Sequence, residues 1–213
     1  MTEVTKTEEV KPLRLDFGCG PNKLKEAGKE FIGVDAIAFP GVDVVLDLTE
    51  KESSVQNKDF SVTHKYKKWI WEDNSVDEIH CSHFLEHLNM EERCHFMNET
   101  YRILKPGAQC RIIVPHWASA RAYGDVTHDP MPVSEFFFYY LSKPWREANA
   151  PHTVASERNP NLFHDEVDFA ATWGYSLHQS LLVRNQEYQT FALGFFKEAA
   201  QDIIATLTKN VKQ

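Results

Sequence analysis

One short stretch near the N-terminus constrains this 213-residue chain more than any other. The apolar run Leu13 to Phe17 predicts a β-strand, and Gly18-Cys19-Gly20 follows it directly. Two glycines at that point allow a sharp turn whose backbone can approach a ligand closely. The next predicted strand, 31–35, ends in Asp35, nineteen residues after Asp16. An acid there can accept hydrogen bonds from both hydroxyls of a ribose, so we expect a nucleotide-like ligand.

The same loop indicates which ligand it is. A dinucleotide site needs a third glycine, and this chain has Lys23 at that position. Asp16, at the start of the loop, would repel a pyrophosphate but suits a ligand that carries an ammonium and a sulfonium group. S-adenosylmethionine is such a ligand.

Four stretches, in this order, resemble class I S-adenosylmethionine-dependent methyltransferases over residues 12–116. They are the glycine-rich stretch 15–21 (LDFGCGP), the strand end 32–35 (IGVD), the fourth-strand region 71–87 with CSHFLEH at its end, and the turn 104–108 (LKPGA). The resemblance implies a methyltransferase with an α/β Rossmann-like fold. Its sheet would be mostly parallel and seven-stranded, with a C-terminal antiparallel hairpin and helices on both faces.

The resemblance also implies roles for individual residues around S-adenosylmethionine, whose product is S-adenosylhomocysteine. Asp16, Gly18, Cys19 and Gly20 would line the methionine part. The ribose would lie at Asp35 and Ala36, the adenine at Asp47 and Leu48, and the sulfonium beside Ser82 and His83. Trp69-Ile70-Trp71 departs from the leucine-proline-phenylalanine run common in relatives.

Strand and helix patterns alternate through the first half, as in a parallel sheet covered by helices. We expect strands at 13–17, 31–35, 42–46, within 75–82 and at 111–114, helices at 23–30 and 90–104, and loop or irregular helix at 50–68. Later in the chain we expect helices at 165–173 and 198–209, with strands 176–183 and 190–196 joined as a hairpin through 184–187.

Composition bounds the organisation of the chain. We expect a flexible tail at 1–11 and one methyltransferase domain at 12–213, with an insertion on the acceptor side at about 115–165. No apolar run is long enough to span a membrane. Four cysteines without CxxC spacing indicate reduced thiols. The expected location is cytoplasmic, with no membrane partner, and the oligomeric state stays open.

The segment after the fifth predicted strand carries the candidate acceptor site. His116 and His128 are candidate general bases, with Asp125 or Asp129 orienting His128. Arg121, Tyr123, Asp125 and His87 are candidate acceptor-binding residues. A competing interpretation is that Arg121 and Asp125 pair only to hold the loop, with His128 at the surface. The aromatic run 136–140 fits a packed helix better than a stacking surface.

His83-Phe84-Leu85-Glu86-His87 also matches H-x-x-E-H, a zinc signature of some peptidases. Two histidines at this spacing can share one helix face. The motif follows a buried strand directly, however, and no downstream helix offers a third ligand. The sequence therefore predicts no metal site.

The net charge of −8 narrows the acceptor class. Nucleic-acid enzymes commonly present a basic stripe, which this chain lacks. We expect methyl transfer to a small molecule, a sugar-like acceptor or a peptide side chain. The alternatives are a non-catalytic S-adenosylmethionine-binding regulatory module and a nucleic-acid methyltransferase.

Overall fold

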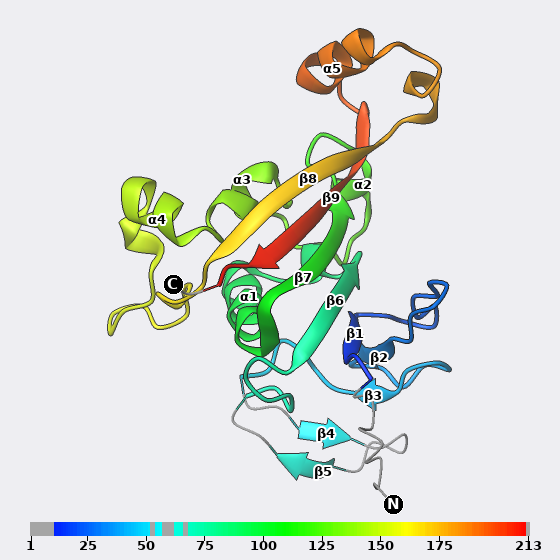
Figure 1. Ribbon diagram of the computed structural model, residues 1–213. Helices are drawn as coiled ribbons and strands as arrows, with labels where there is room; N and C mark the ends of the chain where they lie inside the picture. Colours follow the sequence, from blue (N-terminus) through cyan, green and yellow to red (C-terminus); the bar gives the residue numbers. More distant parts are fainter. Residues whose placement is uncertain (1–10, 52–53, 57–61, 66–67, 212–213) are drawn as a thin grey trace, which may run out of the picture.

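The computed structural model describes residues 11–51, 54–56, 62–65 and 68–211. Their strands form one sheet in the order β5-β4-β3-β2-β1-β6-β7-β9-β8 (Figure 1). The strands are β1 Arg14–Phe17, β2 Ile32–Asp35, β3 Val44–Val45, β4 Ser54–Gln56, β5 Val62–Lys65, β6 Val76–Ser82, β7 Leu104–Pro115, β8 Phe169–Leu177 and β9 Ala200–Lys209. The helices are α1 Met90–Ile103, α2 Arg121–Gly124, α3 Glu135–Tyr139, α4 Lys143–Asn149 and α5 Gln186–Phe195, with 3-10 turns η1 Leu85–His87, η2 Pro151–Thr153 and η3 Gln179–Leu181.

The sheet confirms the predicted fold class. β3, β2, β1, β6 and β7 are parallel neighbours, whereas β9 pairs with both β7 and β8 in antiparallel fashion. These seven strands form the predicted Rossmann-like methyltransferase sheet. The antiparallel strands β4 and β5 extend it beyond β3.

The two faces of the sheet are covered unequally. Phe17, Cys81, Ile112 and Ala205 are register partners across four strands, and all are fully buried on one face. Phe96 of α1 and Phe138 of α3 contact this same face through Phe17 and Trp173. The core therefore lies between the sheet and these helices.

The opposite face carries a polar line of register partners. Asp16, His80, Arg111 and Thr206 lie side by side across β1, β6, β7 and β9. Asp16 and His80 are buried beneath the β1–β2 connection, whereas Arg111 is exposed. This face is thus shielded near the glycine loop and accessible farther along the sheet.

Helix α1 forms where the amphipathic pattern predicted it. Asn89 accepts a hydrogen bond from the Glu92 backbone, and the Glu92 side chain accepts one from the Asn89 backbone. This capping box satisfies two backbone donors at the start of the helix. Buried Phe96, Met97 and Ile103 fix the helix against the sheet.

Two predictions in the first half are wrong. Residues 23–30 form turns rather than a helix: Glu26 and Lys29 make an isolated antiparallel bridge, and Gly28 has a left-handed φ of 77°. β4 and β5 lie in the stretch predicted as loop or irregular helix, which also falls partly outside the described residues. The predicted tail lies outside them except for Lys11.

Helices and strands are interchanged in the last third of the chain. The predicted helix 165–173 overlaps β8, and the predicted helix 198–209 overlaps β9. In both strands burial alternates with period two, as in the buried residues Ile203, Ala205 and Leu207. The predicted hairpin strands 176–183 and 190–196 do not form. α5 occupies most of the second, and it is capped by Asn185, whose side chain accepts a hydrogen bond from the Tyr188 backbone.

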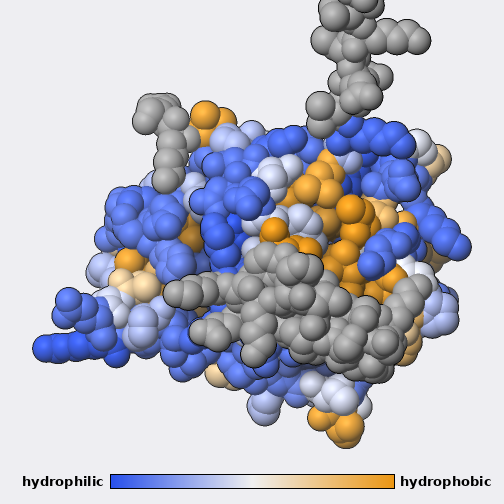
Figure 2. Space-filling model, turned by 90° about the horizontal axis from the view of Figure 1, so that it is seen from below, coloured by the Kyte–Doolittle hydropathy of each residue, from blue (hydrophilic) through white to orange (hydrophobic). Residues whose placement is uncertain are grey.

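The surface seen from below is mainly hydrophilic, with hydrophobic side chains gathered in one region (Figure 2). All four cysteines are buried free thiols, as their spacing predicted. Among the described residues, no helix is both long and apolar enough to cross a membrane.

Candidate functional site: the donor edge and the acceptor cavity

The glycine loop joins the ends of two neighbouring strands. Gly18 and Gly20 adopt left-handed φ values of 62° and 51°, which are costly for other residues. The backbone N–H of Gly20 donates to Asp35 Oδ2 over 2.9 Å, and the N–H of Cys19 donates to the Val34 carbonyl over 3.2 Å. β1 and β2 thus present the loop and the Asp35 carboxylate as one unit, which we call the donor edge (residues 16–20, 35–36, 47–48 and 82–83).

The Asp16 side chain is held within the protein. Its side chain is almost fully buried, with Oδ2 accepting from the Leu24 backbone over 2.7 Å and Oδ1 lying 2.8 Å from His80 Nδ1. Both carboxylate oxygens are therefore occupied. Asp16 fixes the course of the loop, and its contact with the methionine part of a ligand stays a prediction.

Close packing explains why position 18 needs glycine. A Cβ at Gly18 would lie 2.6 Å from the Phe84 ring, whereas one at Gly20 would meet no atom within 4 Å. Phe84 follows β6 and packs on Phe96 of α1. The loop is therefore closed by Phe84 on one side and open to a ligand at Gly20.

Acidic side chains surround the glycine loop. Burial raises the pKa of the Cys19 thiol to about 12, and the negative charges of Asp16 and Asp35 add to the effect. Cys19 is thus a neutral thiol and no nucleophile. The same field favours a positively charged ligand.

The other predicted donor residues also lie at the carboxyl ends of the strands. Asp35 is partly exposed and Ala36 exposed at the end of β2, and exposed Asp47 follows β3 beside buried Leu48. Asp47 Oδ1 accepts from the Thr49 backbone over 2.9 Å. β6 ends at Ser82, which is followed by His83 with a left-handed φ of 53°.

A cavity of about 590 Å³ lies over the ends of β6 and β7. We call it the acceptor cavity; it is lined by His83, Glu86, His87, Pro115, Arg121, Gly124, Asp125, Val126 and His128. It brings together four predicted acceptor-side residues that are up to forty-one positions apart, His87, Arg121, Asp125 and His128. His83 lies next to Phe84, which covers Gly18, and this links the cavity to the donor edge.

His116 does not fit its predicted role as a general base. Its ring is buried, the Ala118 N–H donates to Nδ1 over 3.1 Å, and Nε2 lies 3.1 Å from Glu135 Oε1. Since Nδ1 accepts, the proton is on Nε2 and points at the carboxylate. No lone pair remains for an acceptor, so His116 positions the loop after β7.

His128 has the free nitrogen that His116 lacks. Its Nδ1 lies 3.2 Å from the Ala122 carbonyl oxygen, which can only accept, so Nε2 carries the lone pair. Nε2 lies 4.0 Å from Asp125 Oδ2. Asp129 instead faces Arg93, at 3.8 Å.

Arg121 does not pair with Asp125. Its guanidinium bonds Asp202 of β9 at 2.8 Å, while Asp125 accepts from the Thr127 backbone and hydroxyl over 2.8 and 2.7 Å. The competing interpretation, in which Arg121 and Asp125 pair with each other to hold the loop, is therefore wrong.

Tyr123 lies outside the acceptor cavity. It lines a neighbouring cavity of about 660 Å³ together with Trp117, Phe136, Trp173 and other aromatic residues. Glu135 holds this region together through His116, the Trp117 indole N–H at 3.0 Å, and Tyr175. Burial alone raises the pKa of Glu135, but these hydrogen bonds outweigh it and bring the pKa to about 2.

The predicted aromatic helix adjoins this second cavity. α3 buries Phe137 and Phe138 in the core and leaves Phe136 exposed at the cavity. Tyr139 is also exposed at this cavity, so α3 is half packed, and the expectation of a packed helix rather than a stacking surface stays a prediction.

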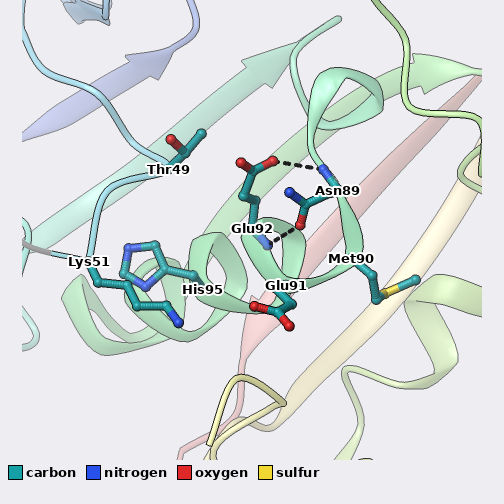
Figure 3. Close-up of a pocket in the computed structure, with 7 residues that line it drawn as sticks. All are labelled: Thr49, Lys51, Asn89, Met90, Glu91, Glu92 and His95. Atoms are coloured by element: carbon teal, nitrogen blue, oxygen red, sulfur yellow. Dashed lines mark hydrogen bonds between the residues drawn. The ribbon is translucent and has the colours of Figure 1, made fainter.

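A third cavity lies at the start of α1 (Figure 3). Thr49, Lys51, Met90, Glu91 and His95 line its volume of about 510 Å³ together with the Asn89–Glu92 capping box. Asn161 bridges the rim by bonding both Lys51 and Glu91. The capping box and Asn161 satisfy most of these polar groups, whereas His95 Nε2 has no hydrogen-bond partner among the described residues. The cavity shares no lining residue with the acceptor cavity.

Comparison with known proteins decides the class. Residues 15–112 match the model of a family described as a methyltransferase domain. This part of the chain carries a methyltransferase domain. In this methyltransferase, the donor edge falls within the matched residues, and the acceptor cavity is completed by residues beyond them.

Two solved structures share the fold. A SAM-dependent methyltransferase from Archaeoglobus fulgidus is 20% identical, with a TM-score of 0.58 over 93% of this chain and 86% of that one. A Haloferax volcanii methyltransferase, solved in complex with the Trm112 methyltransferase activator, is 13% identical, with a TM-score of 0.52 over 95% and 83%. No curated protein sequence matches the chain.

The donor edge fits S-adenosylmethionine. The open space at Gly20 leaves room for the methionine part of the cofactor. The acidic residues around Cys19 suit the positive charges of its ammonium and sulfonium groups. Bound there, the cofactor supplies an electrophilic methyl group.

Proposed function

We propose that this methyltransferase transfers the methyl group to a small molecule or an exposed side chain bound in the acceptor cavity. The observation that carries the proposal is the position of that cavity. It lies over the ends of β6 and β7, and Phe84 connects it to the glycine loop. Ligands of open α/β sheets bind at this edge.

The proposal gives each donor-edge residue a role. Gly18, Cys19 and Gly20 border the methionine part at the open side of the loop beside Gly20, while Asp16 fixes the loop through Leu24 and His80. Asp35 and Ala36 face the ribose. Asp47 and Leu48 face the adenine, and Ser82 with His83 borders the reacting methyl group.

Acceptor polar groups are bound by Arg121, Asp125, His87 and His128. Methyl transfer needs an aligned nucleophile and a way to remove its proton. Of the two predicted bases, only His128 presents a free nitrogen. That nitrogen can remove the proton directly or hold a cation that acidifies the acceptor, and the nearby Glu86 and His87 side chains favour the second.

Calorimetric titration with S-adenosylmethionine, S-adenosylhomocysteine and NAD tests the donor side. We expect both sulfur ligands to bind and NAD not to bind. Transfer of radiolabelled methyl from S-adenosylmethionine to a panel of hydroxyl, amine and thiol compounds tests the acceptor side. A cell extract is tested as a further source of acceptors. If the sulfur ligands bind but neither the panel nor the extract gives a labelled product, the protein is the non-catalytic binding module instead.

A further inference from the structure

We propose that Glu86, His87 and His128 bind one divalent transition-metal ion inside the acceptor cavity. One ligand atom from each residue lies within 4.8 Å of the others. A bound ion draws such atoms to about 3.4 Å apart, which side-chain rotation can provide. Two imidazoles and one carboxylate are a donor set that binds Zn²⁺, Fe²⁺ or Co²⁺ in preference to Mg²⁺ or Ca²⁺.

The Glu86 carboxylate provides independent support. Its side chain is 5% exposed, yet Oε2 has no hydrogen-bond partner among the described residues. A buried carboxylate oxygen without a partner is costly. Oε1 is held by His83 Nδ1 at 3.1 Å, so the carboxylate is oriented with Oε2 left over. A cation at the cavity wall would satisfy this oxygen.

Both histidines are oriented in the way that metal ligands are. His87 Nδ1 lies 3.3 Å from the Thr127 carbonyl oxygen and 3.1 Å from its hydroxyl, whose hydrogen is donated to Asp125. His87 Nδ1 is therefore a donor, as is His128 Nδ1 toward Ala122. In each ring the lone pair is left on Nε2. An Nδ1–H bonded to a carbonyl is the usual second-shell support of a metal-bound histidine.

The neighbouring positive charges have partners of their own. The Arg121 guanidinium bonds Asp202, and the Nε of buried Arg93 donates to the Leu85 carbonyl. Arg93 Nη2 makes no hydrogen bond among the described residues and lies 3.8 Å from Asp129 Oδ1, so Asp129 as well as Glu86 offsets its charge. Asp125 lies 4.0 Å from His128 Nε2 and adds a negative charge to the cavity. The local charge therefore tolerates a divalent cation.

This inference revises the sequence-based expectation that the H-x-x-E-H motif holds no metal. That expectation required a third ligand from a downstream helix, whereas the third ligand comes from the loop after α2. His83, the first histidine of the motif, does not join the cluster and supports Glu86 instead. The motif alone was thus a poor guide to which residues cluster.

The ion suggests the class of acceptor, a step that rests on the proposed function. A hydroxyl bound to the ion loses its proton to solvent more readily. The resulting oxygen forms a bond to the methyl carbon, and the carbon–sulfur bond breaks with its electron pair going to sulfur. The products are a methyl ether and neutral S-adenosylhomocysteine. We therefore infer an oxygen acceptor.

The test uses untagged full-length protein, stripped of metal with EDTA and dialysed. Titration with Zn²⁺ and with Co²⁺ should give one ion per chain. Glu86→Gln and His128→Asn should each weaken binding more than about 10-fold, while His152→Asn, a change at an exposed histidine outside the cluster, should leave it unchanged. No binding by the unaltered protein, or equal binding by all three variants, overturns the proposal.

Two further readouts keep the test decisive. Nitrogen-bound Co²⁺ should give visible absorption bands in the unaltered protein even if a variant fails to fold, and their absence at saturating Co²⁺ overturns the site. A parallel titration with S-adenosylmethionine separates the two proposals. Cofactor binding without metal binding overturns only the metal site, and metal binding without cofactor binding overturns only the proposed function.

Discussion

The donor edge and the acceptor side of this methyltransferase are built in different ways. The donor edge comes from short stretches at the ends of β1, β2, β3 and β6, and hydrogen bonds from Gly20 to Asp35 and from Cys19 to Val34 join its glycine loop to β2. The acceptor cavity takes residues from η1, β7, α2 and the following loop. The donor edge therefore depends on a local backbone turn, and the acceptor side depends on long-range anchors.

Arg146 of α4 is one long-range anchor of the segment between β7 and β8. It is fully buried, and its guanidinium donates to the Tyr140 and Val167 carbonyls over 2.7 and 2.6 Å. Arg146→Met should lower the free energy of unfolding by about 3 kcal/mol, because two buried carbonyls lose their donors. Urea unfolding measures this, with exposed Arg158→Met as the control. A loss no larger than the control's would show that the acceptor side does not depend on this anchor.

Replacing Asp35 should weaken cofactor binding at the donor edge while the protein stays folded. Asp35→Ala removes a charge-assisted acceptor and should weaken S-adenosylmethionine binding by roughly 1–3 kcal/mol. Asp47→Ala should cost less, about 0.5 kcal/mol, because Asp47 is exposed. Calorimetry of both variants checks the order. A larger effect at Asp47 would contradict the assignment of the ribose to Asp35.

Glu135 should make the free energy of unfolding depend on pH. Its pKa is held at about 2 in the folded protein, below the ordinary value of 4.5. The stabilisation is therefore complete above about pH 4.5 and is lost as the pH falls toward 2. We expect a contribution of about 1 to 2 kcal/mol, since the carboxylate is partly accessible.

Unfolding measured between pH 6 and pH 2.5 checks this prediction. Glu135→Gln should flatten the acid decline relative to the exposed control Glu157→Gln. Identical acid profiles for the two variants would remove Glu135 from the account.

The comparison also explains what sequence could and could not predict. The glycine turn, Asp35 and α1 follow from contiguous patterns, so their positions were predictable. His80, the partner of Asp16, lies sixty-four positions away and becomes its neighbour only through the β1–β6 register. No local pattern indicates such a pair.

The acceptor side contains the larger errors for the same reason. His116 follows β7 as expected, but its Nδ1 lone pair accepts the Ala118 N–H, and Glu135 of α3 accepts the hydrogen on Nε2. The apolar residues of β9 fit the spacing of a helix as well as that of a strand, so the sequence predicts a helix there. Pairing with β7 makes the segment a strand. Long-range pairing, rather than local preference, determines these elements.

The central claim is that donor and acceptor bind at two adjoining but distinct places. Titration of S-adenosylmethionine into metal-free Asp35→Ala and His128→Asn, beside the unaltered protein, tests it most directly. We predict weaker binding in Asp35→Ala and unchanged binding in His128→Asn. Unchanged binding in Asp35→Ala together with weaker binding in His128→Asn would contradict the account.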